Sequence, residues 1–384
     1  MSNENKWTPL PSDILNEYEN GEKRDNNIKA AEGRKDVIDA TLADFGFNTR
    51  IEDYTVGPNV TRYNLRLKQN ISIKSIGSII SDIQVRLGGV PVRFDTTTPG
   101  QSTVGIEIEN PQPETVSFKE LYESLPDVDR HPLAIPLGKK IDGEPTWIDL
   151  NAAPHMLITG TIGSGKSMME ESIITSLIMR NSPEDVQFVL IDTKKISFNR
   201  FSDIPHLYCP IVRDSKSIQH VLLQLIKEMG ERYDAYCELN CCSFDEFNEL
   251  MEENGLPTIP YIVVVIDDYA DLVGANREIA SLVLCLAQKS RASGIHLIVC
   301  TERPCTNALT GALKANLPTR LVFMASNTID SITVIGEAGA EKLNGCGDML
   351  VQSPLVSKIG LVRLQGCFIH RTEINRVVTR HFKK

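Results

Sequence analysis

Residues 155–167 read HMLITGTIGSGKS, an apolar stretch that runs directly into a glycine-rich loop. From Gly160 to Ser167 the loop matches the pattern G-x-x-x-x-G-K-[ST] at every fixed position. Glycines let backbone N–H groups turn inward around phosphates, the Lys166 ammonium reaches the β- and γ-phosphate oxygens, and the Ser167 hydroxyl can ligate Mg²⁺. A helix starting there adds its positive N-terminal end. This stretch predicts a nucleoside triphosphate site made of Gly160, Thr161, Ile162, Gly163, Ser164, Gly165, Lys166 and Ser167.

A second stretch, YIVVVIDDYADL at 261–272, places two carboxylates after a run of apolar residues. Five such residues suit a strand buried on both faces, and ligands of parallel sheets bind at the carboxyl ends of the strands. Beside a phosphate loop, Asp267 is expected to hold Mg²⁺ together with Ser167. Asp268 is expected to orient the attacking water, or, in the alternative interpretation, only to cap the following helix.

The two stretches belong to a longer alternation of apolar strands with segments long enough for crossover helices. This pattern predicts an α/β domain with a mostly parallel sheet covered on both faces. We place this domain at residues 133–384. Its expected strands are HMLITG, VQFVLID, YIVVVID, IHLIVCT and RLVFMAS.

The residues before 133 have a different character. Residues 1–32 are polar and mixed in charge, so we expect a leader or linker with little core of its own. Residues 33–132 are predicted to form a small α+β domain. It would have helices in KDVIDATLADFGF and SIGSIISDIQVRL, and strands in TRYNLRLKQNISI, VPVRF and STVGIEIEN, the last two separated by the turn-rich TTTPGQ.

The composition of the 384 residues, 41% hydrophobic and 23% charged, is that of a soluble globular protein. No apolar run is long enough to span a membrane, and the polar start is no signal peptide, so a cytoplasmic location is expected. The nine cysteines form no C-x-x-C pair, which argues against a zinc site. A net charge of −10 still permits a local basic path for nucleic acid.

Several blocks, in the same order, give the chain a resemblance to the FtsK/SpoIIIE family of DNA translocases. In the larger domain these are PHMLITGTIGSGKS, IPYIVVVIDDYADL, QKSRASGIHLIVCTERP, TGALKANLPTR and GAEKLNGCGDML. The smaller domain contributes LADFG, GPNVTRYNLRL and TPGQSTVGIEIEN, and PLPSDIL near residue 9 also matches.

The resemblance implies a two-part motor, with a small domain on a RecA-like P-loop ATPase domain. Copies of it would form a homo-oligomeric, hexameric ring that pumps double-stranded DNA with ATP and Mg²⁺. It also implies that Arg291 reaches the nucleotide of a neighbouring subunit and that Thr301 is a polar sensor. The alternatives are a solvated residue at a helix end for Arg291 and an ordinary strand-end hydroxyl for Thr301.

The chain departs from the family pattern at four positions. Asp268 stands where the family has Glu, and Glu302 stands where it has Gln after the sensor threonine. We expect the two changes to be linked, with Glu302 helping to polarise the water; the alternative is that Glu302 is a surface charge. Thr328 and Ile332 replace two basic residues of the DNA channel, whereas Arg303 is retained as a DNA contact or, alternatively, as a surface charge.

The function indicated by the sequence is therefore an ATP-driven motor acting on double-stranded DNA. With fewer channel cations, the alternative is a related secretion ATPase that grips a protein substrate. The family's membrane spans and winged-helix module are not recognisable in the sequence, so membrane-anchored or recombination partners would be encoded elsewhere.

Overall fold

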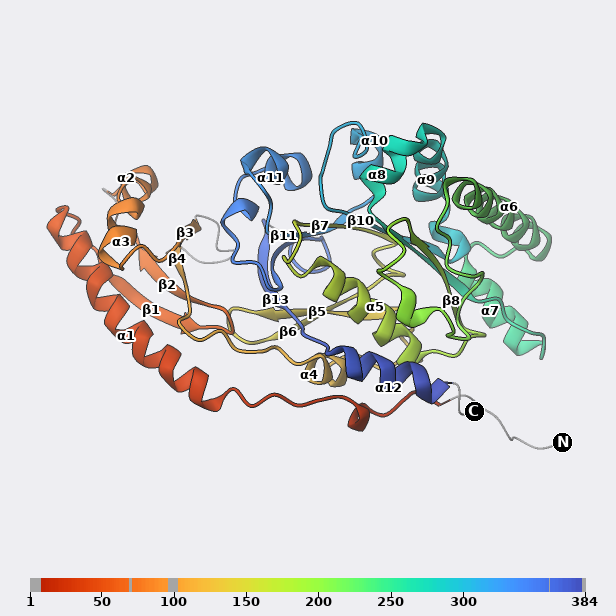
Figure 1. Ribbon diagram of the computed structural model, residues 1–384, viewed down its shortest axis with the longest axis horizontal. Helices are drawn as coiled ribbons and strands as arrows, with labels where there is room; N and C mark the ends of the chain where they lie inside the picture. Colours follow the sequence, from red (N-terminus) through yellow and green to blue (C-terminus); the bar gives the residue numbers. More distant parts are fainter. Residues whose placement is uncertain (1–7, 69–70, 96–102, 359, 382–384) are drawn as a thin grey trace.

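Two β-sheets organise the chain in the computed structural model, which describes residues 8–68, 71–95, 103–358 and 360–381 (Figure 1). The smaller sheet is antiparallel, with the order β1-β2-β4-β3. Its strands are β1 (Ile51–Val56), β2 (Val60–Arg66), β3 (Val92–Asp95) and β4 (Thr103–Glu109). Helices α1 (Gly21–Asp44), α2 (Ile73–Ser78) and α3 (Ile80–Arg86) share one apolar core with it.

The larger sheet has nine strands in the order β6-β5-β13-β12-β11-β7-β10-β9-β8. Strands β8, β9, β10, β7 and β11 are parallel neighbours, which confirms the predicted parallel α/β sheet. Their bounds are β7 (His155–Thr159), β8 (Val186–Asp192), β9 (Tyr261–Asp267), β10 (Ile295–Thr301) and β11 (Thr319–Phe323). Four antiparallel strands extend the sheet: β5 (Ala134–Lys140), β6 (Pro145–Asp149), β12 (Asp348–Gln352) and β13 (Val362–Gly366).

Helices cover both faces of this sheet, as the continuous apolar strands predict. On β9, Val263 and Val265 belong to one core, while Ile262, Val264 and Ile266 belong to the other. The first face is covered by α4 (Phe118–Glu123), α5 (Lys166–Arg180), α7 (Phe244–Glu253), α12 (Arg371–His381) and η2 (Asn199–Phe201). The second face is covered by α6 (Ser215–Leu239), α8 (Tyr269–Ala275), α9 (Arg277–Lys289), α10 (Gly311–Ala315), α11 (Thr328–Ile335) and η4 (Ala340–Lys342).

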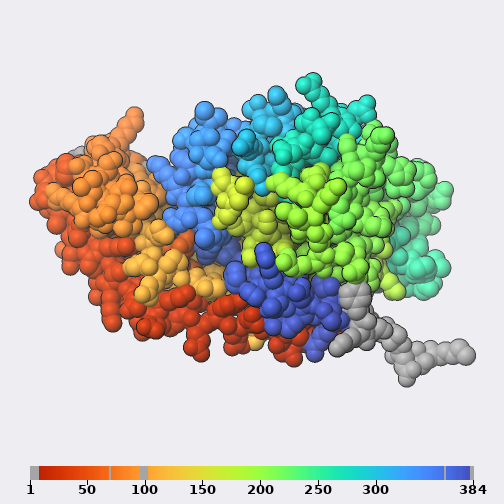
Figure 2. Space-filling model, in the orientation of Figure 1, coloured from red at the N-terminus to blue at the C-terminus, as the bar shows by residue number. Residues whose placement is uncertain are grey.

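The N-terminal segment differs from the expected linker. Leu10 and Leu15, which flank η1 (Ser12–Ile14), are buried in the core of the larger domain. The N–H of Asn16 donates to Glu373 of α12 (2.7 Å), and Figure 2 shows this segment beside the C-terminal helix. Helix α1 begins at Gly21, earlier than the predicted helix, because its polar first half gives little periodic signal. Residues 1–7 and the predicted turn TTTPGQ lie outside the described residues.

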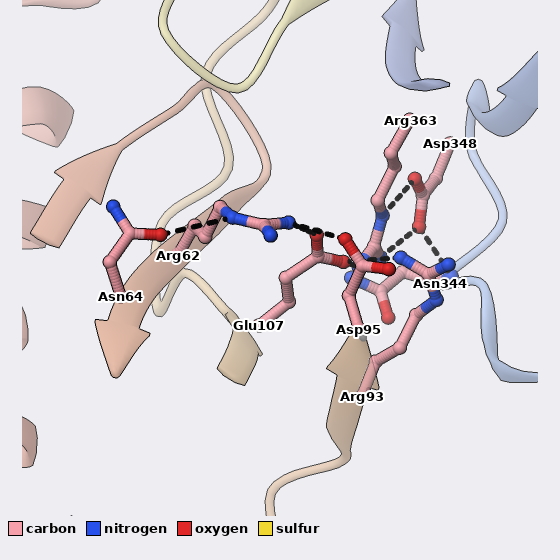
Figure 3. A network of polar contacts seen from close by, with 8 residues as sticks. All are labelled: Arg62, Asn64, Arg93, Asp95, Glu107, Asn344, Asp348 and Arg363. Atoms are coloured by element: carbon pink, nitrogen blue, oxygen red, sulfur yellow. Dashed lines mark hydrogen bonds and ion pairs between the residues drawn. The ribbon is translucent and has the colours of Figure 1, made fainter. Parts of the chain in front are cut away.

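A buried ionic network joins the two sheets (Figure 3). Arg363 of β13 donates to Glu107 of β4 (2.8 Å) and to both carboxylate oxygens of Asp348 on β12 (2.9 and 2.5 Å). Glu107 also accepts from Arg62 and Arg93, each at 2.7 Å. Glu107 therefore lies on the polar face of the small sheet, opposite its apolar core. The division at residues 32 and 132 itself stays a prediction.

Candidate active site

The glycine-rich loop connects β7 to α5 with a geometry that only glycine permits at two positions. Gly165 has φ +114°, and a Cβ there would lie 2.6 Å from the Gly347 nitrogen. At Gly160 a Cβ would lie 2.6 Å from the Phe323 Cβ. The N–H of Gly347 donates to the Ser164 carbonyl (2.8 Å), so the 344–347 segment holds the loop from outside. The predicted phosphate loop therefore takes a tightly constrained conformation ahead of a helix N-terminus.

A cavity of about 710 Å³ opens beside this loop. One wall is the loop itself, from Thr161 to Ser167, and Glu302 also borders the cavity. Two other walls come from 344–347 and from 365–368, which is the end of β13 and the segment after it. The connection after β4 supplies residues 113–116, and Tyr18, which meets Phe368 edge to face at 5.8 Å, completes the lining. A cleft of this volume, lined by a phosphate loop and by the aromatic side chains of Tyr18 and Phe368, has the size of a nucleotide site.

Lys166 is buried and lies between two carboxylates. Its Nζ donates to Asp267 Oδ1 (2.8 Å) and to Glu170 Oε1 (3.1 Å). Burial disfavours the ammonium, but the carboxylates of Glu170 and Asp267 outweigh it and raise the pKa of Lys166. The lysine is therefore positively charged at the point where phosphates would enter.

Asp267 ends β9 directly opposite the phosphate loop. Burial would raise the pKa of Asp267, but the Lys166 ammonium and the Ser197 hydroxyl, which donates to Oδ2 (2.6 Å), lower it overall. An ionised carboxylate here and the exposed Ser167 hydroxyl at the start of α5 are hard oxygen donors. Mg²⁺ is usually held by one or two such donors together with substrate phosphates and water, so these residues fit a nucleotide-bound Mg²⁺.

Asp268 and Glu302 lie on either side of one lysine that the sequence did not single out. Lys194, in the loop after β8, has its Nζ 2.7 Å from Asp268 Oδ2 and 2.6 Å from Glu302 Oε1. Asp268 takes the N-cap position of α8 with φ +57°, but its side chain makes no capping hydrogen bond. The cap interpretation of Asp268 is therefore wrong, and the two acids whose identities depart from the family lie close together.

Thr301 and Arg291 lie at opposite ends of β10. Thr301 is buried beside Thr159, where β10 and β7 end, and its hydroxyl donates to the Arg303 carbonyl (3.3 Å). Arg291 is exposed in η3 (Arg291–Ser293), just before β10 begins. Six residue steps along a strand span roughly 20 Å, so Arg291 is remote from the phosphate loop of its own chain.

The expected DNA-contacting positions are exposed. Arg303 follows Glu302 in the loop after β10, and Thr328 is the first residue of α11. On the same helix Ile329 is 75% exposed and Ile332 is 49% exposed. This surface of α11 therefore presents two exposed isoleucines and the uncharged Thr328, with no cation at either of the two positions expected to face DNA.

Sequence reasoning missed three polar side chains of the site. Lys194 and Ser197 belong to a loop that wraps around Asp192, whose carboxylate accepts from the N–H groups of Lys195 and Ser197, both at 2.9 Å. The third, Glu170, lies one helical turn after the phosphate-loop lysine, and that spacing was the available signal for it.

Among the described residues, no helix is long and apolar enough to cross a membrane.

Comparison with known proteins gives the site a family context. The family model described as FtsK/SpoIIIE family matches residues 119–306, and the FtsK alpha domain model matches residues 10–110. A protein named DNA translocase FtsK from Streptococcus pneumoniae is 37% identical over 350 residues, which is 89% of this chain and 45% of that protein. One of the same name from Oceanobacillus iheyensis is 36% identical over 96% of this chain and 48% of its own length.

Solved structures share the fold. The conjugation coupling protein TcpA of pCW3, in monomer form with ATPγS, superposes with a TM-score of 0.61 at 19% identity, covering 92% of this chain and all of TcpA. The cytoplasmic domain of the type VII secretion ATPase EccC from Thermomonospora curvata gives 0.60 at 24% identity, over 67% of this chain and 32% of EccC. The chain spans about half the length of its FtsK relatives. It belongs to the FtsK/SpoIIIE family, and the match includes both of its β-sheets.

Proposed function

We propose that this chain is an ATP-driven motor that moves double-stranded DNA. The observation that carries the proposal is a complete phosphate loop facing Asp267, in a chain 37% identical over 350 residues to a protein named DNA translocase FtsK. Phosphoryl transfer depends mainly on positioning and on charge stabilisation. Two features support both: Lys166 of the loop contacts Asp267 at the end of β9 (2.8 Å), and Asp268 follows directly in the chain.

In this proposal each described residue has one task. The loop from Gly160 to Ser167 holds the phosphates, and Lys166 leaves Asp267 to contact the β- and γ-phosphates. Ser167 and Asp267 would hold Mg²⁺, and the ion would neutralise charge that develops on the phosphates. The base would occupy the aromatic end of the cavity, near Tyr18 and Phe368.

The proposed assembly is a ring of six copies around the duplex. Arg291 would act on the nucleotide of the neighbouring copy, because its own phosphate loop is a strand length away. Arg303 would contact the DNA backbone.

The direct test is ATP hydrolysis measured with and without duplex DNA. We expect stimulation by duplex DNA, and we expect Lys166→Ala to abolish hydrolysis because the γ-phosphate loses its main protein cation. Replacing Lys289, an exposed lysine on α9, by Ala is the matched control and should leave the rate unchanged. Unchanged turnover in Lys166→Ala would contradict the assignment of the phosphate loop as the ATP site. A hydrolysis rate that does not respond to duplex DNA would contradict the assignment of DNA as the substrate.

The apolar surface of α11 favours one second candidate, a motor that grips a protein. On the DNA proposal, binding is weak and easily salted out, because Thr328 and Ile332 carry no charge. The double variant Thr328→Lys with Ile332→Arg should then bind duplex more tightly and increase the salt slope by about 0.9 for each phosphate that the new cations neutralise. Thr328→Gln with Ile332→Gln is the uncharged control. If the charged variant binds no better, the protein-substrate candidate is favoured.

A further inference from the structure

Glu170 is a buried acid that the proposed reaction does not use. It lies on α5 one turn after Lys166, and its side chain is fully buried. Its Oε1 accepts a hydrogen bond from the Lys166 ammonium (3.1 Å), and the remaining hydrogen-bonding neighbour of this buried carboxylate is the weakly donating Cys300 thiol. The charged and titratable groups near it are Lys166, Asp267 and the buried Cys300 thiol of β10.

We propose that Glu170 is a positioning residue that holds the Lys166 ammonium back from the phosphates and thereby weakens nucleotide binding. The inference rests on the proposed nucleotide site. An ammonium has three donors, and here two of them already point at carboxylates, Glu170 and Asp267. Mg²⁺ would draw Asp267 away from the lysine, because Asp267 is one of its proposed ligands. Glu170 is not a proposed ligand, so Mg²⁺ would not draw it away. Glu170 therefore stays as the competitor when the nucleotide enters.

Charge gives the direction of the effect. A phosphate oxygen bonded to Lys166 would lie within roughly 6 Å of the Glu170 carboxylate, since each would be one hydrogen bond from the same ammonium. Two negative charges at that distance repel strongly in a poorly solvated site. Burial raises the pKa of Glu170 to about 7, against the lowering effect of Lys166, so the site tolerates this charge poorly even without phosphate. Neutralising Glu170 should make both ATP and ADP bind more tightly.

The test compares nucleotide affinity in full-length chains. ATPγS with Mg²⁺, and ADP with Mg²⁺, are titrated against wild type, Glu170→Gln and Glu170→Asp. At about pH 8.5, where the Glu170 carboxyl is ionised, we expect Glu170→Gln to lower both Kd values about tenfold or more and to lower KM more than kcat, with a smaller gain at pH 7, where protonation of Glu170 already relieves the repulsion. Glu170→Asp keeps the charge and should bind nearly as weakly as wild type. The matched control is Glu171→Gln, the next residue, whose carboxylate pairs with Arg200 (3.0 Å) and not with Lys166.

Thermal unfolding without nucleotide checks that each variant is folded. If Glu170→Gln does not fold, Glu170→Leu replaces it, because Leu has similar volume and leaves no polar atom unpaired. Affinity equal to or weaker than wild type in a folded, neutral variant would overturn the inference. Failure of the nucleotide site itself would look different: wild type and Lys166→Ala would then bind ATPγS equally or not at all.

Discussion

Lys194 changes how the two substituted acids are understood. The sequence predicted that Asp268 and Glu302 act together, and the structure brings both onto one ammonium, whose pKa they raise even though burial opposes it. The lysine itself could not be predicted, because its place depends on a loop that folds back onto Asp192. Sequence motifs identified the phosphate loop and Asp267, because both stand directly after an apolar strand. Contacts made by side chains of loops follow no such sequence pattern.

A double-mutant cycle tests whether Asp268 and Glu302 have exchanged roles. Asp268 is one methylene shorter than Glu, and a misplacement of about 1 Å can cost ~10²-fold in rate. If Glu302 compensates, Glu302→Gln should lower kcat by about tenfold or more in the natural background, yet be tolerated once Asp268→Glu restores the longer side chain. Steady-state kinetics of the four proteins measures the coupling.

The control for this cycle is Glu253→Gln, which removes an exposed acid at the end of α7. It should leave kcat unchanged in both backgrounds. If Glu302→Gln alone also leaves turnover intact, the roles have not been exchanged, and Asp268 activates water unaided.

At the scale of elements, the parallel strands of the larger sheet were predictable and its antiparallel strands were not. Strand β9 is buried at every residue, as five consecutive apolar residues require. Strands β5, β6, β12 and β13 are absent from the sequence prediction. They are five to seven residues long, their burial does not alternate along the strand, and the pairing of β5 with β6 shifts register between Pro136 and Gly138, so no regular pattern in the sequence marks them. Helix α1 was predicted only in its second half, because residues 21–34 are mostly polar.

The placement of η3 leads to a prediction about the ring. Arg291 is a strand length from its own phosphate loop, so any catalytic effect must act in trans. An arginine supplied across an interface can be worth ~10³ to 10⁵ in rate. Arg291→Ala should therefore abolish hydrolysis while ATPγS affinity stays at the wild-type value. Lys289→Ala, two residues earlier and also exposed, is the control for loss of charge.

Mixed rings give the decisive measurement for Arg291. When Arg291→Ala chains are doped into wild type, each one disables a neighbouring site, so activity should fall more steeply than the wild-type fraction. A strictly proportional loss would mean that Arg291 does not act across an interface.

At the scale of the whole molecule, the ionic network of Figure 3 ties the small domain to the nucleotide cavity. Asp348 accepts from the N–H of Asn344 (2.9 Å), at the start of the segment that holds the phosphate loop, and from Arg363, which also reaches Glu107. Glu107 and Arg363 are 256 positions apart, and each alone resembles an ordinary strand charge. This is why the sequence predicted two domains but not the ionic network that connects them.

Glu107 is the central residue of this ionic network, and replacing it should lower the free energy of unfolding substantially. It is the shared carboxylate of Arg62, Arg93 and Arg363, so Glu107→Gln leaves one buried and two largely buried guanidinium groups short of a counter-charge. Removing one partner of a buried ion pair typically costs about 3–5 kcal/mol. We expect a loss of that size in the free energy of unfolding by urea at neutral pH. The control Glu52→Gln breaks the exposed pair with Arg66 and should cost at most about 1 kcal/mol.

The pH dependence separates the ionic contribution of Glu107 from simple packing. Burial opposes its charge, but Arg93, Arg363 and Arg62 together lower the pKa of Glu107 from 4.5 to about 2. A depressed carboxyl pKa stabilises the fold fully above the unfolded value and loses that stabilisation as pH falls toward the folded value. Wild type should therefore lose on the order of 3 kcal/mol from this group between pH 4.5 and 2. Glu107→Gln lacks this loss, so the stability gap between the two proteins should narrow on acidification. A gap that stays constant with pH would show that Glu107 contributes by packing and not by charge.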